Sequence, residues 1–279
     1  MVTSQFFAFP VNVIFLFSLL FILFIVKNIP LLHPIWEKIS SSKWLFYALS
    51  LFLGTIFMIQ MMRTFCPDSF SSQNIFFKIG LSRFVSSPFL AVIATCLLFT
   101  LMAHHAKQWT LKFSWKQLQL RLFELGAILI IISLFWGAAD QHQYTIIINK
   151  ETASDIAYTD TQHPVRLPFS IQLNQIHVTK YESGNAKQVE AKFHITQNDK
   201  IYQTQCHVNA PAHFHDYDLY LQSYDTKNGE KNHYCVLMLV KDPWKKTTTT
   251  GIIFMMIAAL MMMIPVKSNV TKEGGVPHD

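Results

Sequence analysis

The chain has 279 residues, of which 51% are hydrophobic and 14% are charged, and its formal net charge is +6. A soluble protein has about a quarter of its residues charged, so this composition argues against a soluble globular chain. The excess positive charge is small and scattered, which argues against a nucleic-acid-binding protein.

Five apolar runs have the composition of transmembrane helices, which need about 20 residues to cross a bilayer. They cover residues 11–26, 44–62, 88–103, 122–139 and 251–266. The third and fifth runs are short, so a tilted or interfacial placement is also open. A cleaved signal peptide is the alternative for the first run. That run has no preceding Lys or Arg and no small-residue cleavage site, so we expect it to be a retained span.

The basic residues of the loops predict how these spans are oriented. Among the short loops, most of them lie between the first and second spans and between the third and fourth, namely Lys27, Lys38, Lys43, Lys107, Lys112, Lys116 and Arg121. Loops rich in Lys and Arg are retained in the cytoplasm. We therefore expect the long region between the fourth and fifth spans to lie outside the cytoplasm.

That long region, residues 141–250, has a different pattern, in which apolar and polar residues alternate as they do in half-buried strands. The apolar residues of 169–173 share one face, and residues 202–208 also alternate. The apolar runs 217–224 and 234–240 are joined by a Gly-containing segment typical of a hairpin loop. This pattern predicts an all-β domain of antiparallel strands, arranged as a small sandwich or a barrel-like module.

The predicted fold is thus a membrane protein with about five transmembrane α-helices and one extracytoplasmic all-β, sandwich-like domain. We expect three parts. Residues 1–140 form a transmembrane region of four helices, and residues 141–248 form the β-domain. Residues 249–279 provide a last transmembrane helix and a cytoplasmic tail.

Two adjacent histidines, His104 and His105, lie at the predicted cytoplasmic end of the third span, just before a basic loop. Neutral imidazole is a good ligand for heme iron, and the nearby Lys107 and Lys112 are suited to pair with heme propionates. The alternative is an interfacial histidine pair that reaches the headgroups beside an aromatic belt. Both interpretations remain open at this point.

Glu124 is the one acidic residue within a predicted span. A carboxylate in lipid is costly, so its presence suggests a function. A simpler explanation is an ion pair with Arg121, three residues earlier on the same helix. The sequence favours this i,i+3 pair.

Other residues of the extracytoplasmic region give weaker signals. His213 and His215 can share a metal ion if the chain is extended there, although a solvated loop is the simpler interpretation. Cys206 and Cys235 fall on predicted strands, and an oxidising compartment permits a disulfide between them. The chain has no CxxC pair, nucleophile elbow, P-loop, HExxH motif or dinucleotide fingerprint. We therefore expect no active site of its own and no metal site.

From about Trp44 onward, the chain resembles the ResB-like family of cytochrome c biogenesis proteins. The resemblance is carried by six short segments in a fixed order, at 87–90, 137–140, 167–173, 208–211, 217–224 and 241–244. The motif residues within them are Pro168, Asn209, Pro211, Tyr220, Tyr224, Asp242 and Pro243. Each segment alone is weak, but their order and their spacing around the spans are specific.

The resemblance implies an accessory role in system II cytochrome c maturation, at the bacterial inner membrane. Heme would be transported or transiently bound, and apocytochrome c and a CcsA-type membrane protein would be the partners. The tryptophan-rich heme-binding motif of a CcsA-type protein is absent here, so that partner is a separate chain. The alternative function is a membrane-anchored envelope sensor or interaction protein that uses the β-domain to bind another ligand.

One position departs from the family pattern. Many relatives have a histidine, proposed as a heme ligand, directly before the Leu-Gly that opens the fourth span, and Glu124 occupies that position here. Spans three and four are joined by a short loop, so they should pair as antiparallel neighbours. We therefore expect His104 or His105 to lie within about one helical turn of Glu124 and to replace the missing imidazole.

Overall fold

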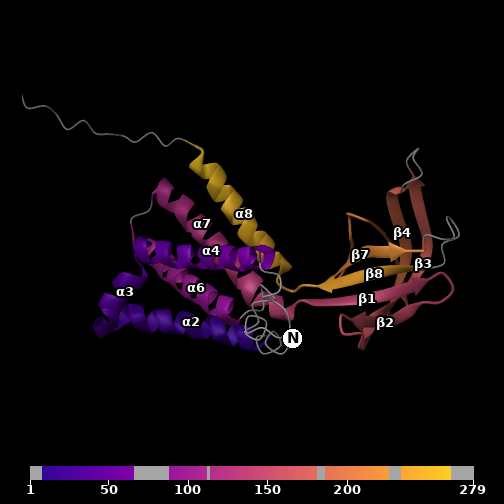
Figure 1. The fold of residues 1–279 in the computed structure, drawn as a ribbon, viewed down its shortest axis with the longest axis horizontal. Helices are drawn as coiled ribbons and strands as arrows, with labels where there is room; N and C mark the ends of the chain where they lie inside the picture. Colours follow the sequence, from indigo (N-terminus) through magenta and orange to yellow (C-terminus); the bar gives the residue numbers. More distant parts are fainter. Residues whose placement is uncertain (1–7, 66–87, 112–113, 181–185, 226–233, 265–279) are drawn as a thin grey trace, which may run out of the picture. The chain divides into compact units, whose positions relative to one another are not determined.

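A computed structural model of the chain describes residues 8–65, 88–111, 114–180, 186–225 and 234–264. The chain forms two compact units. One unit, here called the helical unit, consists of Met1–Ala139 together with Trp244–Asp279, and the other, the β-domain, is Asp140–Pro243. Figure 1 shows the elements of both units.

The described residues of the first unit are mainly helical. The helices are α2 (Val11–Asn28), the short 3-10 helix η1 (Pro30–Leu32), α3 (His33–Ile39), α4 (Ser42–Phe65), α6 (Pro88–Gln108), α7 (Trp115–Phe135), the 3-10 turn η4 (Gly137–Asp140) and α8 (Lys245–Met262). Short turns connect the helices from α2 to α4. A proline lies within the first turns of both η1 and α3. Proline fits such positions because it has no amide hydrogen and its φ is already helical.

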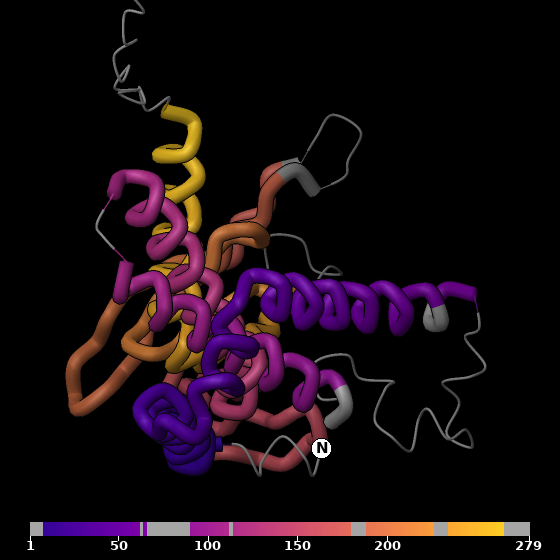
Figure 2. Tube along the Cα trace, turned by 90° about the vertical axis from the view of Figure 1, so that its left-hand side faces the viewer, coloured from indigo at the N-terminus to yellow at the C-terminus, as the bar shows by residue number. Residues whose placement is uncertain are grey.

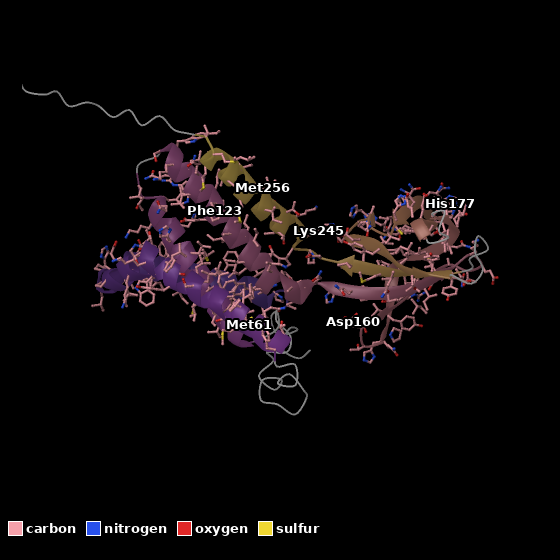
Figure 3. All side chains as sticks on the ribbon, turned by 45° about the horizontal axis from the view of Figure 1, so that its top comes forward. Met61, Phe123, Asp160, His177, Lys245 and Met256 are labelled. Atoms are coloured by element: carbon pink, nitrogen blue, oxygen red, sulfur yellow. The ribbon has the colours of Figure 1, made fainter. Side chains whose placement is uncertain are left out.

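Four of these helices are long and apolar enough to cross a membrane. The crossing segments are Val11–Asn28, Ser42–Met61, Leu90–Gln108 and Trp115–Phe135. Apolar side chains such as Phe123 and Met256 remain exposed on the helices, as Figure 3 shows. Such surfaces need a lipid environment, so the chain is a membrane protein.

The fifth predicted span, residues 251–266, overlaps α8, which has 18 residues and begins six residues earlier. Two lysines and four threonines open this helix, and α8 is not among the four crossing segments found in the described residues. Whether α8 crosses the membrane therefore stays a prediction.

Helices α7 and α8 lie side by side (Figures 1 and 2) because two glycines face each other across the pair. A Cβ atom added to Gly126 would lie 2.6 Å from the carbonyl oxygen of Gly251. Gln119 adds a hydrogen bond from Nε2 to the Met261 carbonyl oxygen at 2.7 Å. The two helices therefore approach closely because neither glycine has a side chain, and the Gln119 amide adds a hydrogen bond between them.

The second unit is a single antiparallel sheet of eight strands. They are β1 (His142–Asn149), β2 (Ser154–Thr159), β3 (Pro164–Lys180), β4 (Ala186–Gln197), β5 (Lys200–His207), β6 (Ala212–Phe214), β7 (Tyr217–Tyr224) and β8 (Tyr234–Lys241). Their order across the sheet is β5-β4-β3-β2-β1-β8-β7-β6. The antiparallel all-β prediction is thus confirmed.

The sandwich-like arrangement takes the form of one curled sheet rather than two separate sheets. The edge strand β5 contacts both β6 and β7 at the opposite edge, with the rings of Tyr202 and Phe214 5.3 Å apart. Register shifts in β3, between Leu173 and Gln175, and in β7, between Leu221 and Ser223, mark bulges. A bulge bends a strand, which lets the sheet close over its own core.

The core of the β-domain lies on the inner face of this curl. In β3, Leu167, Phe169, Ile171 and Leu173 are buried at every second position, as the alternation in the sequence predicts. Strands β1, β4, β7 and β8 contribute alternating buried residues in the same way. The polar residues between them consequently face outward.

Candidate functional site

The carboxylate of Glu124 lies inside the helical unit, with 3% of its side chain exposed. Its Oε1 is 2.6 Å from Nδ1 of His104, and its Oε2 is 3.3 Å from Nδ1 of His105. Each carboxylate oxygen therefore meets a different imidazole. The three side chains form a cluster that we call the Glu124 cluster.

The helix geometry explains why two adjacent histidines reach one carboxylate. Successive residues of an α-helix project about 100° apart, since one turn contains 3.6 residues. His104 and His105 therefore lie on either side of the line along which α6 contacts α7. The end of α6 and the start of α7 lie together because the helices form an antiparallel pair, as the short loop predicts.

The second nitrogen of each imidazole also has a partner. Nε2 of His104 is 3.1 Å from the hydroxyl of Ser42, the first residue of α4. Nε2 of His105 accepts a hydrogen bond from the indole N–H of Trp109 at 2.9 Å. An indole can only donate, so in its neutral form His105 carries its proton on Nδ1 and donates it to Glu124.

The predicted ion pair between Glu124 and Arg121 is wrong. Arg121 instead donates from Nη2 to the carbonyl oxygens of Gln108, at 2.7 Å, and Leu111, at 3.1 Å. Its guanidinium also lies over the ring of Trp109, 5.0 Å from the centroid. The carbonyl groups at the C-terminal end of α6 carry partial negative charge and lack partners within the helix, so they bind the guanidinium.

Of the two lysines predicted to pair with heme propionates, only Lys107 lies in the described part of the chain. Lys107 donates to Oε2 of Glu37 on α3 at 2.6 Å. That hydrogen bond and the charge of Lys107 hold the pKa of Glu37 below its usual value. Lys107 is therefore already bound to a carboxylate, the same chemical group as a propionate. Lys112 lies outside the described residues.

The motif segments of the β-domain meet in part around a surface hollow of about 490 Å³. Pro168 and Phe169 on β3 line it together with Tyr217 and Lys241, from the ends of β7 and β8. The other motif residues lie elsewhere in the domain. Asn209 and Pro211 form the turn between β5 and β6, Tyr220 and Tyr224 lie on β7, and Asp242 and Pro243 follow β8.

His213 and His215 do not converge on a common point. His213 on β6 pairs with Asp218 on β7, directly across the hairpin. His215 lies in the turn with a φ of 51°, and its Nε2 bonds the side-chain oxygen of Gln197 at 2.9 Å. The change of backbone conformation in the turn points the two imidazoles toward different partners.

Cys206 and Cys235 are both free thiols in the core of the β-domain. Burial raises the pKa of Cys206 to about 11. Burial, together with the charge of Cys206, raises the pKa of Cys235 to about 12. The structure has no disulfide between these two residues, and the raised pKa values disfavour the reactive thiolate form of each thiol.

Sequence reasoning missed three residues of the cluster's surroundings, Ser42, Glu37 and the indole of Trp109. Ser42 and Glu37 are far from the histidines along the chain, and no local spacing connects them. Trp109 follows His105 by four residues, and this i,i+4 spacing on α6 was the one available signal.

Comparison with known proteins gives a family match and a distant structural likeness. Residues 112–238 match the model of the ResB-like family. This range includes four of the six sequence segments named above. No curated protein matches the chain. A solved structure of the cytochrome c heme lyase CcmF is 11% identical, with a TM-score of 0.40. The alignment covers 63% of this chain and 30% of that one, so this chain spans less than a third of its length.

Proposed function

We propose that the chain is a membrane subunit of system II cytochrome c maturation, because residues 112–238 match the model of the ResB-like family. In this role it assists the delivery of heme across the membrane and its attachment to apocytochrome c. The family match supports this function. The chain acts as an accessory subunit, and a CcsA-type membrane protein is its partner for the attachment step.

The Glu124 cluster is the part of the helical unit suited to handle heme as cargo. A histidine that binds a metal usually donates its other ring N–H to a carboxylate, which fixes the ring and makes the free nitrogen more basic. His104 has this arrangement, since its Nδ1 contacts Glu124 and its Nε2 contacts only a hydroxyl. The family's histidine is thus replaced by a carboxylate that positions an imidazole of the neighbouring helix.

The residues around His104 fit such a ligand. Ser42 is exposed, and its hydroxyl can rotate away from Nε2 without breaking a buried structure. The Nε2 atom of His105 is bound to an indole N–H instead, which makes His104 the preferred ligand. Lys107 would exchange the Glu37 carboxylate for a propionate. When bound, heme supplies the iron that becomes part of the mature cytochrome.

The β-domain completes the proposal as the surface that meets apocytochrome c outside the cytoplasm. Its orientation is the one that the basic loops of the sequence predict, and its eight-stranded sheet offers an extended outer face. This assignment rests on topology reasoning. Labelling of single-cysteine variants at Asn228 and Lys112 in intact cells tests the orientation, with only the first expected to react.

Deleting the gene tests the function. We expect holocytochrome c to disappear while the apoproteins are still exported, because heme attachment and export are separate processes. Heme staining of membrane fractions measures the first, and immunodetection of a tagged apocytochrome measures the second. Normal heme staining in the deletion strain would contradict heme delivery and favour the sensor function.

A further inference from the structure

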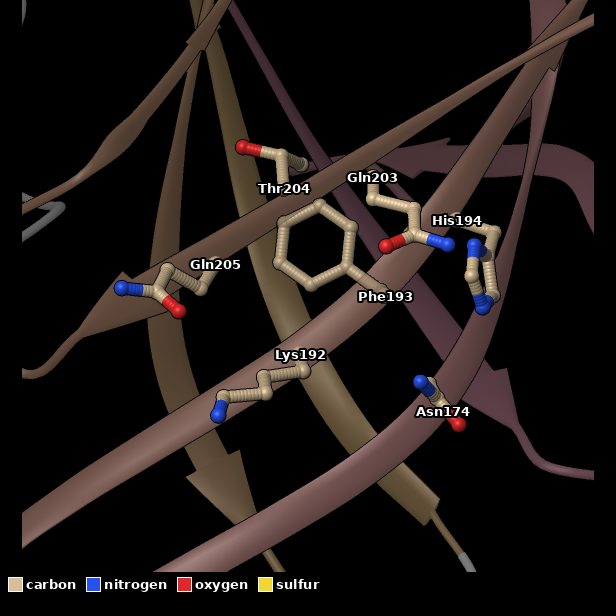
Figure 4. Close-up of a pocket in the computed structure, with 7 residues that line it drawn as sticks. All are labelled: Asn174, Lys192, Phe193, His194, Gln203, Thr204 and Gln205. Carbon is tan, nitrogen blue, oxygen red and sulfur yellow. The ribbon is translucent and has the colours of Figure 1, made fainter.

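The outer face of β3, β4 and β5 has a polar hollow of about 450 Å³ that the proposed function does not use (Figure 4). Side chains of Asn174, Lys192, His194, Gln203 and Gln205 line it. Hollows of this size are typical of sites for small ligands or for one group of a larger ligand.

Strand pairing places these side chains on one face. His194 is the register partner of Gln203, and Lys192 is the partner of Gln205. The residues that alternate with them on β4, namely Ala191, Phe193 and Ile195, are buried in the core. The polar set therefore projects outward as two adjacent rows, and paired strands fix the positions of both rows.

A bulge in β3 adds Asn174 to the hollow. The register between β3 and β4 shifts between Leu173 and Gln175, so Asn174 has no partner residue on β4. The bulge moves β3 away from a regular ladder and aims an extra amide toward the two rows. Bulges are frequent beside binding sites for this reason.

His194 carries an unsatisfied polar atom at this site. Its Nδ1 is buried and has no hydrogen-bond partner among the described residues. Its other register partner, Gln172, donates instead to the carbonyl oxygen of Lys150 at 2.9 Å. Leaving a buried polar nitrogen unpaired costs about 1–3 kcal/mol, and a bound ligand that pairs with it removes this cost.

The lining of the hollow defines the chemistry of the ligand. Every polar side chain in it can donate a hydrogen bond, and none of them is acidic. Lys192 supplies a positive charge, and its Nζ lies 3.6 Å from Glu190. An ion pair this long between partly exposed groups is weak and leaves Lys192 available to another anion.

We propose that this hollow is a binding site for a carboxylate group presented by a ligand outside the membrane. A carboxylate accepts up to about four hydrogen bonds, and the donors around this hollow are Lys192, His194 and the amides of Asn174, Gln203 and Gln205. Charge-assisted hydrogen bonds to several preformed donors give both affinity and orientation. Two sources carry this group, a porphyrin with free propionates and an acidic peptide, and both present the same chemistry to the site.

The test uses the full chain in phosphatidylcholine nanodiscs and compares Lys192→Gln with the unchanged protein. The probes are mesoporphyrin IX, its dimethyl ester, a short tri-glutamate peptide and the corresponding tri-glutamine peptide, with both peptides amidated at the C-terminus. Lys200→Gln is the control, because Lys200 is also an exposed lysine on this face's strands and does not line the hollow. Circular dichroism checks that each variant is folded.

We expect at least one free carboxylate probe to bind and Lys192→Gln to weaken it by about tenfold or more, since a charge-assisted bond is lost. The ester or tri-glutamine probe should not show this difference. Binding of the porphyrin diacid alone identifies a porphyrin as the source, and binding of tri-glutamate alone identifies a peptide. Equal binding by Lys192→Gln, or no binding of either carboxylate probe, overturns the proposal. Neither result depends on cytochrome maturation.

As a second variant, Asn174→Ala removes an uncharged donor and leaves the net charge unchanged. It should weaken binding of the same probe. An effect confined to Lys192→Gln would mean nonspecific attraction to positive charge and would contradict a site formed by several donors.

Discussion

The helical unit and the β-domain place their polar residues in opposite ways. Of the nine polar or charged residues that are buried in the described part of the chain, eight lie in the helical unit and one, Asp225, in the β-domain. The β-domain instead turns its polar residues to its outer surface. In a membrane, a polar side chain cannot face lipid cheaply, so the helical unit turns such groups inward.

Most of the inward-facing groups in the helical unit bond to backbone carbonyls. Asn12, Gln119 and Ser133 donate to the carbonyl oxygens of Trp136, Met261 and Leu129, respectively. Glu124 differs, because its partners are two imidazoles on another helix. Ordinary helix packing explains the first kind of contact. The second kind is a cluster of ionisable groups, which in a membrane indicates a functional site.

The largest expected effect on stability comes from removing the carboxylate of the Glu124 cluster. Glu124→Ala should destabilise the helical unit by about 3–5 kcal/mol, because it leaves two partly buried imidazoles without their carboxylate. Thermal unfolding in detergent measures the loss. Glu37→Ala is the matched control, since that carboxylate also bonds a basic side chain but is about half exposed. Equal losses of stability in both variants would contradict the expectation that the buried carboxylate contributes more than the exposed one.

A smaller effect should come from the close approach of α7 and α8. Gly126→Ala should destabilise the chain by about 1–3 kcal/mol, because the added methyl group collides with backbone atoms of α8. Gly54→Ala is the control, as a Cβ atom there meets nothing within 4 Å. Alanine is the better helix former, so the control should be neutral or stabilising in the same unfolding assay.

The smallest effect is expected in the β-domain, where ion pairs are exposed. The hydrogen bond from Nε of Arg166 to Oδ2 of Asp155, 2.7 Å long, holds the pKa of Asp155 below its usual value. A lowered pKa stabilises the fold above the ordinary Asp pKa, and this contribution is lost as the pH falls through the folded value.

Asp155→Asn should therefore lower the unfolding temperature slightly at neutral pH, and the difference should vanish in strong acid. Asp160→Asn, at an exposed position in the neighbouring turn, is the control for the lost charge. A difference in unfolding temperature that grows toward acid pH would contradict the expected direction of this pH dependence.

The sequence predicted the β-domain better than it predicted the helical unit. Alternation identified the inward face of 167–173, because a strand's side chains depend on a local period of two. The partner of Glu124 depends instead on which face of α6 meets α7. The i,i+3 rule suggested Arg121, and the antiparallel pairing of the two helices suggested His104 and His105. The structure confirms that proximity and rejects the Arg121 pair.

The most direct test of the central claim is the heme that copurifies with the full chain after His104→Ala and His105→Ala are combined. His177→Ala, an exposed histidine on β3, is the matched control. If the Glu124 cluster handles heme, the double variant still inserts into the membrane but loses both the copurified heme and its absorption spectrum, whereas the control keeps them. Unchanged heme content and spectrum in the double variant would contradict the claim and leave the two histidines as structural partners of Glu124.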